Sequence, residues 1–131
     1  MMVAGAEAGA GPRRVLTITL NPALDLATFA DHVVPGPKLR CDAPRMEPGG
    51  GGVNVSRAIR ILGGESLVMI VAGGPAGATL EGLLRAEGIE PLVMPGPGPT
   101  RESLAVTDRS TGAQFRFVMP GPDWGVQDTE A

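Results

Sequence analysis

The predicted architecture rests on one stretch, Glu47-Pro48-Gly49-Gly50-Gly51-Gly52-Val53-Asn54-Val55-Ser56-Arg57-Ala58-Ile59-Arg60-Ile61-Leu62-Gly63-Gly64. After the four glycines, apolar residues recur at i, i+3, i+4 and i+7, the spacing of one buried helix face: Val55, Ala58, Ile59 and Leu62. Gly63 and Gly64 follow, where a helix often needs a left-handed cap. The pattern predicts a helix of about ten residues that begins at the glycines.

Glycines at the start of a helix suit ligand binding, because a ligand can approach a backbone whose N–H groups lack intrahelical partners. Asn54 adds an amide that both donates and accepts, which suits the vicinal hydroxyls of a sugar. The dinucleotide fingerprint does not fit, since Asn54 or Val55 stands where its last glycine is needed. The Walker loop does not fit either, because no lysine follows Lys38. A flexible linker remains the alternative, and the adjoining helix disfavours it.

Composition indicates one folded domain in a chain of 131 residues, of which 43% are hydrophobic. The net charge of −3, with scattered cations, disfavours nucleic acid as a partner. Cys41 and His32 are the only residues of their types, so no internal disulfide or Cys/His metal cluster is expected, and a cytoplasmic location fits. No apolar run is long enough to span a membrane. Residues 1–13 are expected to be a loose leader, 14–124 the domain and 125–131 a tail.

The first apolar segment, Val15 to Leu20, has the β-branched composition of a strand at the centre of a sheet. Pro22 should end this strand and place Asp25 just past its carboxyl end, where open α/β sheets bind ligands. Asp25 is therefore a candidate acceptor for a hydroxyl group. An Asx turn or a helix cap is the alternative interpretation.

Residues 27–47 predict a small β excursion from the main sheet, with short strands at 28–33 and 39–43. Lys38 and Arg40 alternate with Leu39, so both cations are expected on one strand face, where they could meet an anion. A solvated strand face is the alternative.

The order of the next elements indicates a parallel sheet with right-handed crossovers. A buried strand at 66–72 precedes a helix that ends at Gly88, and a third strand follows at 89–94. The predicted buried face of this helix consists of Ala76, Leu80, Leu83 and Leu84.

A hairpin is predicted from Leu104–Thr107 and Phe115–Met119. Arg101 precedes it at the end of a Pro/Gly-rich loop, where a guanidinium suits a bidentate phosphate contact. A surface ion pair is the alternative for Arg101.

Several of these segments together resemble the ribokinase-type (PfkB) carbohydrate kinases, and most closely their phosphofructokinase branch. The resemblance runs from about residue 15 to residue 123 and is strongest in the following segments: 17–25 (Thr-Ile-Thr-Leu-Asn-Pro-Ala-Leu-Asp), 38–40, 49–58, 72–74, 100–101 and 115–121. It implies a ribokinase-like α/β fold, a mostly parallel sheet flanked by helices with a small β lid.

The resemblance also implies roles for individual residues. Asp25, Gly50, Gly51 and Asn54 would hold sugar hydroxyls, while Lys38 and Arg101 would hold the phosphate of a fructose phosphate or a similar phosphosugar. The β lid would close the site and could form a homodimer.

The resemblance covers only the N-terminal part of the family pattern. The family's Gly-Ala-Gly-Asp segment, which carries the catalytic Asp, does not occur in this sequence, nor do the segments that bind ATP and Mg²⁺. No catalytic or metal-binding residue is therefore predicted. The leading hypothesis is the substrate-binding segment of an ATP-dependent sugar-phosphate kinase, inactive alone. A non-catalytic phosphosugar-binding or dimerising module is the main alternative, and a nucleotide-binding oxidoreductase domain is a weaker one.

Overall fold

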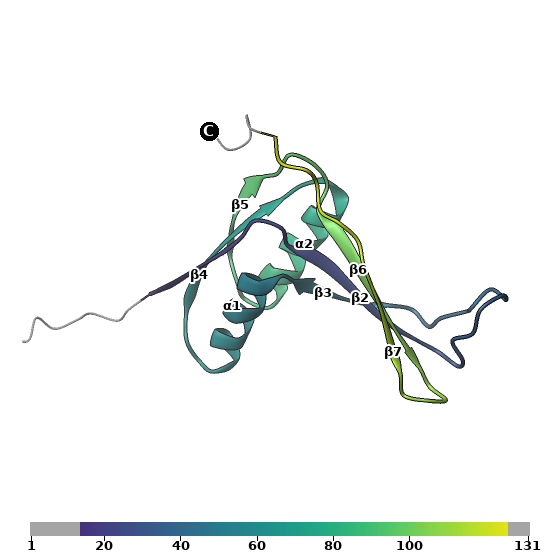
Figure 1. Ribbon diagram of the computed structural model, residues 1–131. Coiled ribbons are helices and arrows are strands. Elements are labelled where there is room, and N and C mark those ends of the chain that lie inside the picture. Colours follow the sequence, from purple (N-terminus) through teal and green to yellow (C-terminus); the bar gives the residue numbers. More distant parts are fainter. Residues whose placement is uncertain (1–13, 126–131) are drawn as a thin grey trace, which may run out of the picture.

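The computed structural model describes residues 14–125, which form two sheets and two helices (Figure 1). The predicted leader and all of the predicted tail except Gly125 lie outside these residues. In chain order the elements are β1 (Val15–Thr19), β2 (Ala23–Ala30), β3 (Arg45–Gly49), α1 (Gly51–Ile61), β4 (Ser66–Ala72), α2 (Gly74–Ala86), β5 (Pro91–Pro95), β6 (Arg101–Asp108) and β7 (Gln114–Val118).

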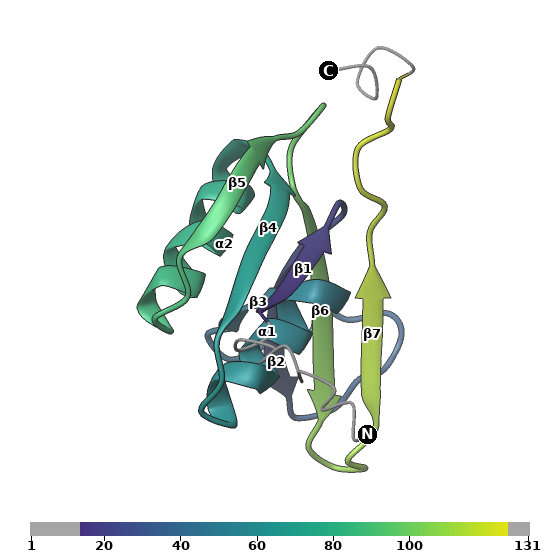
Figure 2. The same cartoon turned by 90° about the vertical axis from the view of Figure 1, so that its left-hand side faces the viewer.

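The three-stranded sheet has the order β1-β4-β5 and is parallel throughout, as the sequence predicted. Both helices lie on the same face of this sheet (Figure 2). The core lies between this face and the helices, and α2 contributes Leu80 and Leu84, as expected. The other core residues are Val53, Val68, Ile70, Ala72 and Ile89.

The prediction that the first strand is central was wrong for the described part of the chain, because β1 lies at an edge of its sheet. Its side chains alternate, with Thr17 and Thr19 facing α1 while Leu16 and Ile18 are exposed on the opposite face. Leu67, Leu92 and Met94 continue this exposed face on β4 and β5. One face of the parallel sheet is therefore apolar and uncovered by the described residues.

Helix α1 begins at the glycines, as predicted, and Gly63 after its end has a φ of +82°. Its predicted buried face was wrong: Val55 and Leu62 are exposed, whereas Val53 and Ser56 are buried. The reason lies in β1, which presents threonine hydroxyls to the helix. The Oγ of Ser56 and the Oγ1 of Thr17 are 2.6 Å apart, so a small polar side chain is required at this contact.

The second sheet has the order β3-β2-β6-β7 and contains the predicted hairpin as β6 and β7. It extends away from the parallel sheet and is called the lid sheet below (Figure 1). The strands predicted at 28–33 and 39–43 were wrong, since β2 begins at Ala23, and β3 at Arg45. Residues 31–44 form a loop with a single bridge, between Ala30 and Cys41. Lys38 and Arg40 are therefore exposed loop residues and do not share a strand face.

Asp108, at the end of β6, fastens this loop to the hairpin. Its Oδ1 accepts hydrogen bonds from the Ser110 hydroxyl at 2.6 Å and the Ser110 N–H at 2.8 Å, and its Oδ2 accepts one from the Val33 N–H at 2.9 Å. These bonds, the Ser110 hydroxyl first, lower the pKa of Asp108 from 3.8 to about 2, although desolvation acts in the opposite direction. The folded lid sheet therefore favours the ionised form of the Asp108 carboxyl group.

We predict that Asp108→Asn lowers thermal stability at neutral pH and weakens its dependence on acid. Because the carboxylate has a lower pKa in the folded chain, it stabilises the fold above about pH 4, and this contribution is lost as the pH falls toward about 2. Circular dichroism melts of the wild type should show a steep fall in melting temperature over this range, and those of Asp108→Asn a shallower one. Parallel pH profiles for the two proteins would contradict the assignment.

Candidate ligand cavity between the lid sheet and helix α1

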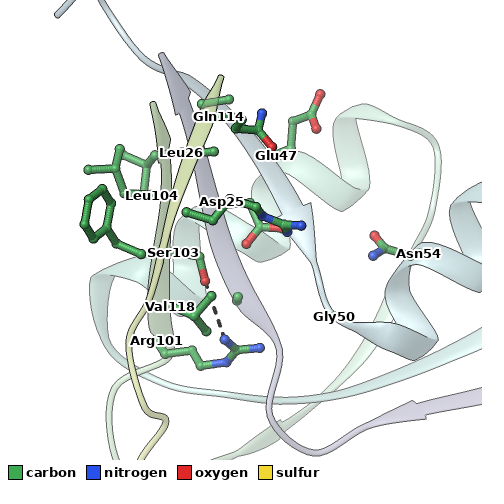
Figure 3. Close-up of a pocket in the computed structure, with 15 residues that line it drawn as sticks. Asp25, Leu26, Glu47, Gly50, Asn54, Arg101, Ser103, Leu104, Gln114 and Val118 are labelled. Carbon is green, nitrogen blue, oxygen red and sulfur yellow. Dashed lines mark hydrogen bonds between the residues drawn. The ribbon is translucent and has the colours of Figure 1, made fainter. Parts of the chain in front are cut away.

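The lid sheet and the start of α1 border an open cavity of about 450 Å³. Figure 3 shows Asp25 and Arg101 on the lid strands, with Gly50 and Asn54 across the cavity at the start of the helix. The residues that line it are Ala23, Asp25, Leu26, Ala27, Glu47, Gly50, Asn54, Arg101, Ser103, Leu104, Ala105, Gln114, Arg116, Phe117 and Val118. Four of the six predicted site residues therefore meet in one place.

The start of α1 requires glycine at two positions for different reasons. Gly50 is the N-cap residue and has a φ of +123°, which L side chains rarely adopt. Gly52 packs against β1, where a Cβ would lie 2.6 Å from the Oγ1 of Thr19. The same hydroxyl accepts a hydrogen bond from the N–H of Val53 at 3.1 Å. The N–H of Val53, which directly follows the four glycines, is therefore already bonded within the protein.

Asp25 lies within β2, not in the predicted turn after β1. Strand β1 already ends at Thr19, three residues before Pro22, and a new strand begins directly after Pro22 because β2 pairs with β3 and β6 on its two sides. The Asp25 carboxylate lies over the backbone of Gly49, where a Cβ would overlap it. Its neighbour in the register on β3 is Glu47, and on β6 Ser103. This packing fixes the carboxylate at the wall of the cavity.

Arg101 begins β6 opposite Ala23, at the end of the cavity nearest β1. Its guanidinium makes two long contacts, from Nη1 to the Oγ of Ser103 and from Nη2 to the carbonyl oxygen of Asn21, both at 3.5 Å. Its Nε is buried and has no hydrogen-bond partner among residues 14–125. Because its two Nη groups make only long contacts and the residue lines the cavity, this guanidinium is suited to an anionic ligand.

Two predicted site residues are not in the cavity lining. Gly51 is the first residue of α1 and adjoins the lining residue Gly50. Lys38 lies in the exposed loop 31–44, so the structure does not bring it into the cavity. The predicted roles of both residues remain predictions.

The structure adds four polar residues that the sequence analysis did not select as site residues: Glu47, Ser103, Gln114 and Arg116. Strand alternation offers a signal for Ser103, since it stands two residues after Arg101 and so shares its face. Arg116 reaches the same face through its register with Ala105. The sequence alone could not place Arg116 in the cavity, because its position depends on the hairpin register. Glu47 could not be placed either, because it lies on β3, a strand that was not predicted.

Residues 14–125 contain no group of three His, Cys, Asp or Glu side chains placed to bind a metal ion. None of the helices described is both long and apolar enough to cross a membrane.

The family model described as pfkB family carbohydrate kinase matches residues 18–129, so this chain belongs to that family. This chain is 47% identical over 120 residues to the ATP-dependent 6-phosphofructokinase isozyme 2 of Mycobacterium tuberculosis. The alignment covers 92% of this chain. The same alignment covers 35% of that relative, so the chain spans about a third of its length. The family resemblance predicted from the sequence is confirmed.

Solved structures of phosphofructokinase-2 from Escherichia coli share the fold. One, in complex with fructose-6-phosphate, superposes with a TM-score of 0.84 at 43% identity, covering 89% of this chain and 39% of that chain. Another is a tetrameric inhibited form, with a TM-score of 0.82 at 43% identity, covering 89% of this chain and 38% of that chain. The predicted ribokinase-like α/β fold is confirmed over the part that this chain covers.

We predict that Gly49→Ala destabilises the chain, because the new methyl group would force the Asp25 carboxylate or strand β3 to move. The expected loss is about 1–3 kcal/mol in the free energy of unfolding, measured by urea denaturation. Gly82→Ala is the matched control: position 82 is exposed within α2, and a Cβ there meets nothing within 4 Å. It should stabilise the chain by roughly 0.5–1 kcal/mol. Equal effects of the two substitutions would show that Asp25 does not occupy the space over Gly49.

Proposed function

We propose that this chain is the acceptor-binding, N-terminal part of an ATP-dependent sugar-phosphate kinase of the phosphofructokinase branch. The observation that carries the proposal is the Arg101 guanidinium, which lines the same cavity as Asp25 and Asn54 and makes only two long hydrogen bonds, both of 3.5 Å, among the described residues. An anion site and groups that bind hydroxyls, held in one cavity, are the requirements for recognising a phosphosugar.

Each group has a separate task in this proposal. Asp25 accepts hydrogen bonds from sugar hydroxyls, and Asn54 both donates to them and accepts from them. Backbone N–H groups at Gly50 and Gly51 offer further donors at the helix start. Arg101 binds the phosphate in bidentate fashion. The relative solved with fructose-6-phosphate supports a fructose phosphate as the ligand class.

Two further cations extend the proposed phosphate site. Arg116 lines the cavity from β7 and adds positive charge to the face that carries Arg101. Family resemblance supports Lys38 as a phosphate contact, and its exposed position in loop 31–44 means that the loop would have to bring it to the ligand. We propose Arg101 as the primary phosphate contact and Lys38 as a secondary one.

ATP and Mg²⁺ are expected for the full-length family, and the relatives named above are about three times as long as the aligned segment. Residues 14–125 do not fit a metal site, since they contain no suitable ligand cluster. We propose that the phosphoryl-transfer groups belong to the part of a full-length kinase that this chain does not align with, and that this chain alone binds the acceptor without transferring a phosphoryl group. Phosphoryl transfer consists largely of positioning and charge stabilisation, so loss of nucleotide positioning should abolish turnover.

We predict that Arg101→Ala weakens the binding of fructose 6-phosphate by roughly 1.5–3 kcal/mol, the usual cost of losing a hydrogen bond to a charged group. Isothermal titration calorimetry of the wild type and the variant measures this difference. Arg85→Ala is the control, because Arg85 is exposed on α2 and pairs with Glu81 and Glu90 away from the cavity. Equal affinities of Arg101→Ala and the wild type would remove Arg101 from the phosphate site, and no binding by the wild type would contradict the proposed function.

The lid sheet also supports the proposed homodimer. On its face opposite Asp25, four apolar side chains form a row across all four strands: Met46, Leu26, Leu104 and Phe117. Met46 is 46% exposed and Phe117 is 52% exposed, so the ends of the row are open. A contiguous exposed apolar row is typical of a protein–protein interface, and a relative forms a tetramer. We propose that two lid sheets pack through this row.

We predict that Phe117→Glu shifts self-association toward monomer, by roughly 30-fold or more in dissociation constant if Phe117 is a hot spot worth about 2 kcal/mol. Sedimentation velocity over a range of concentrations measures the change. Leu92→Glu serves as the control, since Leu92 is 62% exposed on the uncovered face of the parallel sheet. If Leu92→Glu instead of Phe117→Glu produces monomers, the chain associates through the parallel sheet and the lid proposal is wrong.

A further inference from the structure

Arg57 lies outside the cavity lining but joins α1 and β3, which border the cavity, to α2. It is on α1, one turn after Asn54, and its side chain is 24% exposed. Its Nε and Nη2 donate to the two carboxylate oxygens of Glu87 at 2.8 and 2.9 Å, and its Nη1 donates to the carbonyl oxygen of Pro48 at 3.2 Å. Glu87 is the C-cap residue of α2, so one guanidinium connects α1, α2 and β3.

The carbonyl group that Arg57 holds belongs to the peptide that connects Pro48 to Gly49. Pro48 is fully buried at the end of β3. The Asp25 carboxylate lies over Gly49, and the next residue, Gly50, is the N-cap of α1. A displacement of this peptide would therefore move the surface beneath Asp25 and the start of the helix together.

The charges around Arg57 are consistent with this geometry. Hydrogen bonds to Glu87 raise the pKa of the guanidinium, partial burial opposes the rise, and the carboxylates of Glu87, Glu47 and Asp25 raise it further. Arg57 thus remains charged and is close enough to Asp25 for their charges to interact. Lysine could not replace it, because a bidentate contact with Glu87 and a third bond to Pro48 require the planar fork of a guanidinium.

We propose that Arg57 is a positioning residue for the phosphosugar cavity: oriented by Glu87, it holds the Pro48–Gly49 peptide and so fixes the Asp25 carboxylate. This inference rests on the proposed function. A purely structural link between the two helices would stabilise the chain without setting the position of Asp25, so the two roles differ in what they predict for ligand binding.

The test uses Arg57→Lys as the mild variant, Arg57→Met as the severe one, and Arg85→Lys as a matched control. Arg85 also makes a two-oxygen contact, from Nε to Glu90 at 2.9 and 3.1 Å, but among the described residues it pairs only with Glu81 and Glu90 and not with β3. Three quantities are measured for each protein: affinity for fructose 6-phosphate by calorimetry, stability by urea denaturation, and the amide resonances of Gly49 and Gly50 in ligand-free ¹⁵N-labelled chain.

Arg57→Lys should lower fructose 6-phosphate affinity by about 10-fold or more, the usual effect of losing a group that orients a binding residue. It should also shift the Gly49 and Gly50 resonances, while Arg85→Lys should leave the affinity and both resonances at wild-type values. An Arg57→Lys protein that is destabilised but keeps wild-type affinity and unchanged glycine resonances would overturn the proposal.

The two proposals fail in different ways. If the wild type does not bind fructose 6-phosphate, the proposed function fails, and the glycine resonances still report whether Arg57 holds the Pro48–Gly49 peptide. If the wild type binds and Arg57→Lys binds equally well, only the role of Arg57 is wrong. Should Arg57→Met fail to fold, the comparison of Arg57→Lys with Arg85→Lys is sufficient.

Discussion

The contact between β1 and the start of α1 is the constraint on which the rest of the structure depends. The helix approaches the strand so closely that Gly52 has no room for a Cβ, and the hydroxyl of Thr19 accepts a hydrogen bond from the N–H of Val53. The buried pair of Thr17 and Ser56 continues the contact one turn later. Because these contacts fix the rotation of α1 about its axis, they also fix where Gly50 and Asn54 face the lid sheet.

The four glycines therefore differ in what they do, although the sequence pattern alone suggested one shared role in ligand binding. Gly49 makes space for Asp25, Gly50 supplies a left-handed backbone, and Gly52 permits the close approach to β1. A Cβ at Gly51 meets nothing within 4 Å, so packing places no demand on that position. Close packing at Gly49, Gly50 and Gly52 thus shapes the helix side of the cavity, and the lid strands line its other side.

Local patterns predicted much of this structure and failed where distant segments decide the outcome. The glycine-bounded helix, the alternating strands and helices and the hairpin were evident from periodicity and turn residues. The buried face of α1 was not, because the apolar period favours Val55 and Leu62, whereas the burial of polar Ser56 depends on its contact with Thr17 of β1. The strand character of Asp25 and Glu47 arises from pairing within the lid sheet, which no local pattern reveals. Four of the six site residues were nevertheless brought together, since each was selected for its chemistry at the end of an element.

The central claim is that the cavity between the lid sheet and α1 is where a phosphosugar binds. A titration of ¹⁵N-labelled chain with fructose 6-phosphate, followed residue by residue, tests it most directly. The account predicts that the amides of Gly50 and Asn54 and the Nε–H of Arg101 shift together and saturate with one dissociation constant. A second hollow of about 270 Å³, lined by residues that include Gly64 and Gly88, offers an internal comparison. Shifts confined to Gly64 and Gly88, with Gly50, Asn54 and Arg101 unmoved, would contradict the account.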